Sequence, residues 1–123
     1  MGNKEILKND ELITKFIGRQ GKVRKDLYTF IGVSDINNGD PWFTLEDAKF
    51  HTSMDWLMPV IIKIRGNPIV TNVNYNVAGD FIIEGLTKTE VLNIIINRED
   101  FKSDLEMIYF GITEFINWYN KNK

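Results

Sequence analysis

FHTSMDWLMPVIIKI, residues 50–64, is the most informative stretch of this chain for its fold. An apolar stripe recurs in it at helical spacing, formed by Leu57, Val60, Ile61 and Ile64. Further apolar side chains lie off that stripe, namely Trp56, Met58 and Ile62. A helix that is apolar over most of its girth is buried on more than one side. We therefore predict a central helix, covered within its own domain or by a second chain.

The same stretch also predicts how this helix begins and where it bends. Thr52 precedes Asp55 by three residues, which resembles a capping box in which each side chain satisfies a backbone N–H of the other. Pro59 lies inside the pattern, where it lacks a backbone donor and crowds the carbonyl of Asp55. We therefore predict a kink at Pro59.

Two more helices are predicted on either side of this one. Asn9 followed by two acids indicates the start of a short amphipathic helix, which Gly18 ends in a left-handed conformation. Near the other end of the chain, Ser103 and Glu106 form a full capping box. Apolar residues follow it at helical spacing: Leu105, Ile108, Tyr109, Ile112, Phe115, Ile116 and Tyr119.

The remaining segments favour strands. Residues 27–33 are rich in aromatic and β-branched side chains, residues 35–41 are rich in turn formers, and Thr44 can cap a short helical turn at residues 45–49. Residues 69–77, 81–84 and 91–97 indicate a meander, although Thr87 with Glu90 leaves a helix open near the last run. The predicted fold class is α+β. It has an antiparallel sheet of three to five strands, two long helices packed on it and a short N-terminal helix.

Composition narrows the classes of function. A chain of 123 residues is one domain by size, residues 1–123, and 43% hydrophobic with 26% charged residues is typical of a globular protein. Its net charge of −2 argues against DNA or RNA as a partner. Without cysteine there is no disulfide, thiolate nucleophile or cysteine-ligated zinc. Because no apolar run approaches roughly 18 residues, we predict no membrane partner.

A cluster of cations stands out against this acidic background. Residues 18–25, GRQGKVRK, hold four of them within seven positions: Arg19, Lys22, Arg24 and Lys25. The glycine spacing is not that of a phosphate-binding P-loop. The segment is either a loop that closes on phosphates or a solvated loop that balances the surface charge. In the first case Arg65 and Arg98 could support it, and Tyr28, Trp42 or Trp56 could stack on a base.

The sequence offers little for catalysis. His51 is the single histidine, so a nucleophilic triad or a zinc site lacks its usual parts, and the residue is more typical of a structural hydrogen bond. The acids at Asp35, Asp40, Glu46 and Asp47 fit turn and cap roles rather than a metal site. Carboxylate pairs remain open, but no pair stands out. We predict a binding protein, neither an enzyme nor a carrier of a cofactor.

Two segments carry a resemblance to a known family. MDWLMPV, residues 54–60, is similar to a Trp-Asp-Trp-Leu-Met-Pro-Val pattern of small phage proteins, with Met54 in place of the first Trp. FINWYN, residues 115–120, resembles the ending of such proteins. Among them are the first-described type of Thoeris anti-defence sponge proteins. The resemblance implies a phage protein that binds and sequesters a cyclic ADP-ribose isomer from TIR immunity enzymes without degrading it.

The expected setting follows from the same resemblance. Such a protein would act in the host bacterial cytoplasm, and cyclic oligonucleotides stay open as further ligands. The apolar girth of the two long helices predicts a homodimer, or a higher homo-oligomer, through residues 54–64 or 107–118. The alternative is a small phage interaction protein of the same fold that inhibits or modulates a host protein.

Overall fold

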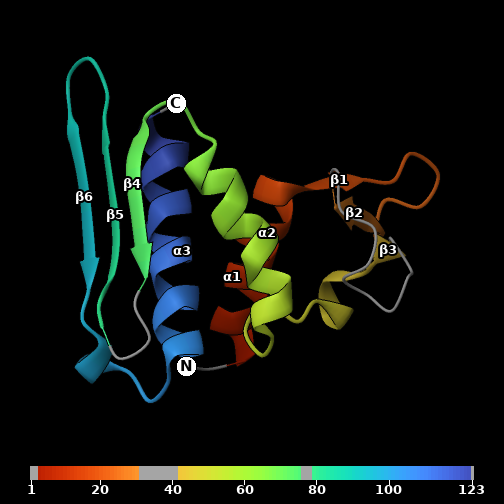
Figure 1. The fold of residues 1–123 in the computed structure, drawn as a ribbon. Coiled ribbons are helices and arrows are strands. Elements are labelled where there is room, and N and C mark those ends of the chain that lie inside the picture. The colour runs from red at the N-terminus through yellow and green to blue at the C-terminus, as the bar shows by residue number, and fades with distance from the viewer. Residues whose placement is uncertain (1–2, 31–41, 76–78, 123) are drawn as a thin grey trace. The chain divides into compact units, whose positions relative to one another are not determined.

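A computed structural model describes residues 3–30, 42–75 and 79–122, with the side chains of Asn3, Arg19 and Phe30 outside the description. The helices and two antiparallel three-stranded sheets establish the predicted α+β class (Figure 1). The chain divides into two compact units, which we call unit 1 (Met1–Pro59) and unit 2 (Val60–Lys123). The predicted single domain therefore stays a prediction. None of the described helices is long and apolar enough to cross a membrane.

Unit 1 begins with helix α1, Asn3–Ile17. The predicted start at Asn9 is wrong, because the good helix formers upstream extend the helix by almost two turns. Asp10 consequently lies within the helix, on the same face as the buried Ile13 and Ile17, and is itself buried. Gly18 does not end the helix in a left-handed conformation. It begins a strand where a Cβ would stand 2.8 Å from the carbonyl oxygen of Thr14.

The first sheet is built from three short strands, β1 (Gly18–Gln20), β2 (Tyr28–Phe30) and β3 (Trp42–Phe43), in the order β1-β2-β3. The basic segment is thus the tip of a hairpin. Its turn is closed by the N–H of Gly21, which donates to the carbonyl of Leu27 at 2.8 Å. The predicted helical turn is confirmed as η1, Leu45–Asp47, where Thr44 Oγ1 accepts the N–H of Asp47 at 3.3 Å. The predicted turn at residues 35–41 lies outside the described residues.

Helix α2, Met54–Arg65, forms as predicted and runs through Pro59. Its predicted cap is wrong. Thr52 Oγ1 donates to the carbonyl of Lys49, and the first helical N–H groups bond instead to the carbonyl of Ser53. The predicted stripe is buried, from Leu57 to Ile64, whereas Met58 and Ile62 are exposed. The kink at Pro59 stays a prediction. The boundary between the two units falls inside this helix.

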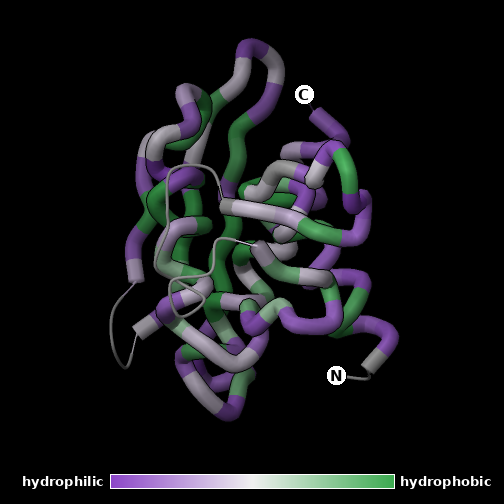
Figure 2. Tube along the Cα trace, turned by 90° about the vertical axis from the view of Figure 1, so that its right-hand side faces the viewer, coloured by the Kyte–Doolittle hydropathy of each residue, from purple (hydrophilic) through white to green (hydrophobic). Residues whose placement is uncertain are grey.

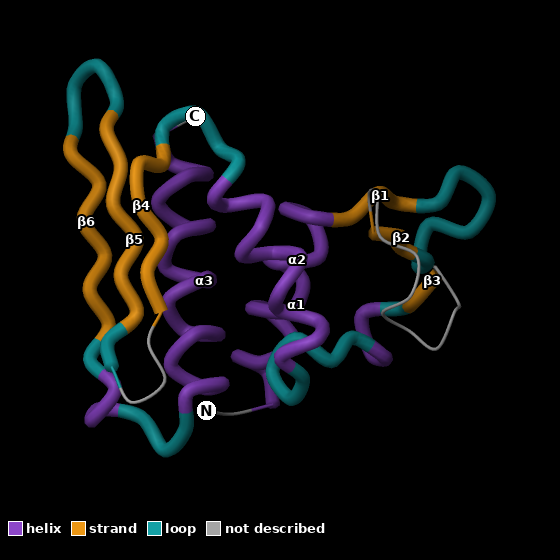
Figure 3. The backbone as a smooth tube through the Cα atoms, viewed as in Figure 1, coloured by secondary structure: helices purple, strands orange, loops and turns teal. Residues whose placement is uncertain are grey.

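The predicted meander is confirmed in unit 2 by β4 (Val70–Tyr75), β5 (Phe81–Leu86) and β6 (Val91–Ile96), in that order (Figure 3). The Thr87–Glu90 signal closes a hairpin turn and does not start a helix. The Thr87 hydroxyl accepts the N–H of Glu90 at 2.9 Å, and the Thr87 N–H donates to the Glu90 carbonyl at 2.8 Å.

Helix α3, Asp104–Asn122, packs on β5 and β6. Its predicted cap is present, since Ser103 Oγ accepts the N–H of Glu106 at 3.2 Å. Figure 2 shows hydrophobic and hydrophilic stretches interspersed along the trace. The core of unit 2 includes Phe81, Ile83, Leu92, Ile108 and Ile112, all fully or almost fully buried.

Candidate ligand groove

A groove of about 680 Å³ lies on the hairpin of unit 1. The hairpin turn forms one part of it and the indole of Trp42 another. Its lining combines apolar side chains with two cations and consists of Gln20, Gly21, Lys22, Val23, Arg24, Leu27, Thr29 and Trp42. The basic segment and one predicted stacking residue are therefore brought together, in a space large enough for a small ligand.

The two cations of the groove differ in their surroundings. The guanidinium of Arg24 forms a bidentate pair with Asp26, through Nε to Oδ1 at 3.1 Å and Nη2 to Oδ2 at 2.7 Å. This hydrogen-bonded pair raises the pKa of Arg24 and lowers the pKa of Asp26. Both side chains are exposed, so water screens the pair and an incoming anion can replace the carboxylate. Lys22 is also exposed on the groove.

The backbone at Gly21 holds the turn close to Trp42. A Cβ at this position would stand 2.7 Å from the carbonyl oxygen of Arg24 and 3.4 Å from Cζ3 of the indole. Only glycine fits such an approach without moving the turn. Trp42 nevertheless keeps 42% of its surface exposed, which leaves part of the ring accessible.

The other predicted site residues of unit 1 lie elsewhere or beyond the description. Arg19 is in β1, but its side chain lies outside the described part of the chain. Lys25 is exposed and does not line the groove; its carbonyl accepts a hydrogen bond from Gln20 at 2.6 Å. Tyr28 is buried, with its ring 6.3 Å from Phe43.

Trp56 belongs to an aromatic cluster in the core of unit 1. Its ring meets Phe43 at 5.0 Å and Phe50 at 5.1 Å, both edge to face, and only 2% of the residue is exposed. Such pairs add to the burial energy of the rings themselves. The Trp of the family-like motif therefore has a packing role in this structure, and its face is not open to a ligand.

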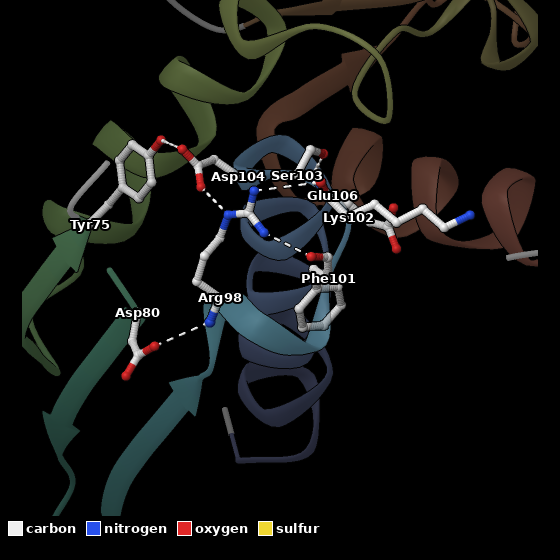
Figure 4. Close-up of polar contacts among 8 residues, drawn as sticks. All are labelled: Tyr75, Asp80, Arg98, Phe101, Lys102, Ser103, Asp104 and Glu106. Carbon is white, nitrogen blue, oxygen red and sulfur yellow. Dashed lines mark hydrogen bonds and ion pairs between the residues drawn. The ribbon is translucent and has the colours of Figure 1, made fainter. Parts of the chain in front are cut away.

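The two arginines of unit 2 do not line the groove either. Nη2 of Arg65 lies 3.5 Å from the carbonyl oxygen of Val73, beside a hollow of about 300 Å³. Arg98 pairs with Asp104 through Nε and donates from Nη1 to the carbonyl of Phe101 at 2.7 Å (Figure 4). These contacts fasten the segment before α3 to the first turn of that helix.

Asp104 has a second partner, Tyr75, which makes the stability of the fold depend on pH. The hydroxyl of Tyr75 donates to Asp104 Oδ2 at 3.0 Å (Figure 4). Burial, together with this bond, raises the pKa of Tyr75 above its ordinary value of 10.0. A raised pKa in the folded state means that the contribution of Tyr75 to stability is complete below about pH 10. It is lost as the pH rises through the folded-state pKa.

We therefore expect the free energy of unfolding to fall above about pH 10, and less steeply in Tyr75→Phe. Urea unfolding of both proteins at several pH values from about 8 to 11 measures this difference. Parallel curves for the parent and Tyr75→Phe would contradict the assignment.

A part-buried hydrogen bond between His51 and Asp10 was missed in the sequence. His51 Nδ1 lies 3.1 Å from Asp10 Oδ2, and the side chain of Asp10 is 2% exposed, against 32% for His51. His51 also borders a hollow of about 350 Å³ with Thr52 and Lys49. The predicted structural hydrogen bond of His51 is thus present. The spacing of Asp10 with Ile13 and Ile17 was the signal that could have placed the acid on the buried face.

No group of three or more metal-binding side chains occurs among the residues that the structure describes. Comparison of the chain with protein families, with curated proteins and with solved structures finds no match.

Proposed function

We propose that this protein binds and sequesters an anionic nucleotide of the cyclic ADP-ribose class, as a phage sponge for the signal of TIR immunity enzymes. The observation that carries the proposal is the groove on the hairpin of unit 1, where Lys22 and Arg24 line the same space as Trp42. A nucleotide with a pyrophosphate needs this combination of cations and an aromatic face. The family resemblance of residues 54–60 and 115–120 supports the ligand class.

The groove suggests how the ligand would lie. The pyrophosphate would bind Arg24, whose planar fork exchanges Asp26 for phosphate oxygens, and Lys22 would add a point charge. The exchange favours the ligand, because a screened exposed pair contributes little and the two phosphates of the pyrophosphate together carry two negative charges against one on the carboxylate. A base would stack on the exposed part of Trp42, with Val23 and Leu27 as apolar neighbours in the groove.

The first experiment is calorimetric titration with individual cyclic ADP-ribose isomers, followed by heating of the complex and chromatography of the released nucleotide. We expect tight binding of at least one isomer and its recovery unchanged. Recovery of a cleaved product would identify an enzyme and contradict the sponge. Failure of every isomer to bind would contradict the ligand class and leave the host-protein modulator as the better hypothesis.

The second experiment locates the site. Arg24→Ala and Trp42→Ala should each weaken binding on the order of tenfold to a hundredfold, which corresponds to one lost charge-assisted bond or one stacking partner. Arg65→Ala removes an arginine that does not line the groove and should bind like the parent. Thermal melting of each variant verifies the fold. Unchanged affinity in both groove variants would show that the basic hairpin is merely solvated.

A further inference from the structure

Strand β6 is one edge of the sheet in unit 2, with β5 on its inner side (Figure 3). The turn between β5 and β6 determines which backbone groups of β6 form hydrogen bonds with β5. Because Thr87 bonds Glu90 across the hairpin, the alternation of an antiparallel ladder directs the backbone groups of Leu92, Ile94 and Ile96 toward β5. The N–H and C=O groups of the alternate residues point away from the sheet, namely those of Val91, Asn93 and Ile95.

The two edges of this sheet are not equally protected. The β4 edge carries an irregularity in its register between Val70 and Asn72, and its outward side chains are polar. The pairing of β6 with β5 is unbroken over the whole strand, and β6 contains neither proline nor a charged residue. Val91 and Ile95 are exposed by 74% and 54%. Natural sheets blunt their free edges with bulges, charges or proline, and β6 has none of these devices.

We propose that β6 pairs antiparallel with β6 of a second copy of this chain, which joins two three-stranded sheets into one of six strands. The strand is self-complementary about Asn93. With Asn93 opposite its own copy, Val91 stands opposite Ile95 of the second copy, and the outward-directed backbone groups of all three residues meet. The same register lets the outward backbone groups form hydrogen bonds and lets the exposed apolar side chains cover one another.

This interface differs from the one expected from the helices. Met107, on the α3 surface assigned to a dimer, is fully buried within the chain, so that part of the predicted surface is already covered. Met58 and Ile62 on α2 are exposed but present no unpaired backbone groups, since a helix satisfies its own. The edge of β6 offers both exposed apolar side chains and outward-directed backbone groups. The pairing does not depend on the proposed ligand.

The test measures oligomeric state without nucleotide, by analytical ultracentrifugation from about 10 to about 500 µM, because a short strand pair makes a weak interface. The parent should dimerise within this range. Ile95→Lys and Asn93→Pro should be monomeric, the first through charge and the second through loss of an outward N–H. Ile62→Lys is the control on α2 and should dimerise like the parent. Circular dichroism checks that each variant is folded.

Hydrogen exchange gives a readout for the parent that requires no substitution. The amides of Val91, Asn93 and Ile95 should become more protected as the protein concentration rises. The amide of Val73, which points away from β5 at the β4 edge, should not change. A parent that is monomeric at every concentration would overturn the proposal. So would a dimer that Ile62→Lys disrupts while Ile95→Lys does not.

Discussion

Gly111→Ala is expected to lower the free energy of unfolding by about 2 kcal/mol. A Cβ at Gly111 of α3 would stand 2.3 Å from Cδ2 and 2.6 Å from Cε2 of Phe81, whose side chain is fully buried. Overpacking of this kind costs about 1–3 kcal/mol or more, because the ring cannot move away in a filled core. Alanine returns about 1 kcal/mol as a better helix former than glycine, so the steric cost prevails.

Urea unfolding followed by circular dichroism measures the change. Gly66→Ala is the matched control, because a Cβ there would meet its nearest atom at an ordinary 3.6 Å. That variant should be as stable as the parent or slightly more stable. Phe81→Leu in the Gly111→Ala background should recover part of the loss, since the smaller side chain leaves room for the methyl group. Additive effects of the two substitutions would show that the contact is absent.

His51→Ala is expected to have an effect of similar size in unit 1, about 2–3 kcal/mol. Loss of one partner costs a buried hydrogen-bonding group roughly 1–3 kcal/mol, or more if the group is charged. Water can reach the space that His51 leaves, because its side chain is 32% exposed, and this limits the loss. Asp10 is 2% exposed and cannot turn to solvent without unpacking α1.

The measurement is again urea unfolding, with Asp10→Asn and the double variant completing a cycle. We expect the double variant to lose less than the sum of the single losses, because either single substitution already removes the contact that the two residues share. Lys15→Ala breaks an exposed pair with Glu11 on the same helix and should change stability little. If His51→Ala proves as harmless as Lys15→Ala, the pair does not hold α1 in place.

Local patterns were enough to predict most of the elements. The stripe at residues 57–64 and the Ser103 cap identified α2 and α3, since periodic burial and capping act within a few residues. The alternation in residues 69–97 likewise predicted the meander. Helix α1 began earlier than predicted, because the helix propensity of its first residues outweighs the N-cap preference of Asn9.

The candidate site was predicted only in part. The sequence marked the basic segment and several aromatic residues, but spacing alone could not tell which aromatic lies beside the cations. Tertiary packing placed Trp42 at the hairpin and buried Trp56 between Phe43 and Phe50. Both indoles are equally suited to stacking by their chemistry, and burial decides which one remains accessible.

Patterns in the sequence were sufficient to predict the fold class, the apolar faces of α2 and α3 and the position of the basic segment. The structure was needed to establish that this segment is a hairpin, that Asp10 contacts His51, and that β6 lies at an edge of its sheet. Helical stripes and caps arise from neighbours in the chain. The order of the short strands in the first sheet and the contact of Asp10 with His51, 41 residues apart, arise from contacts between distant segments. Such contacts leave no periodic signal in one sequence.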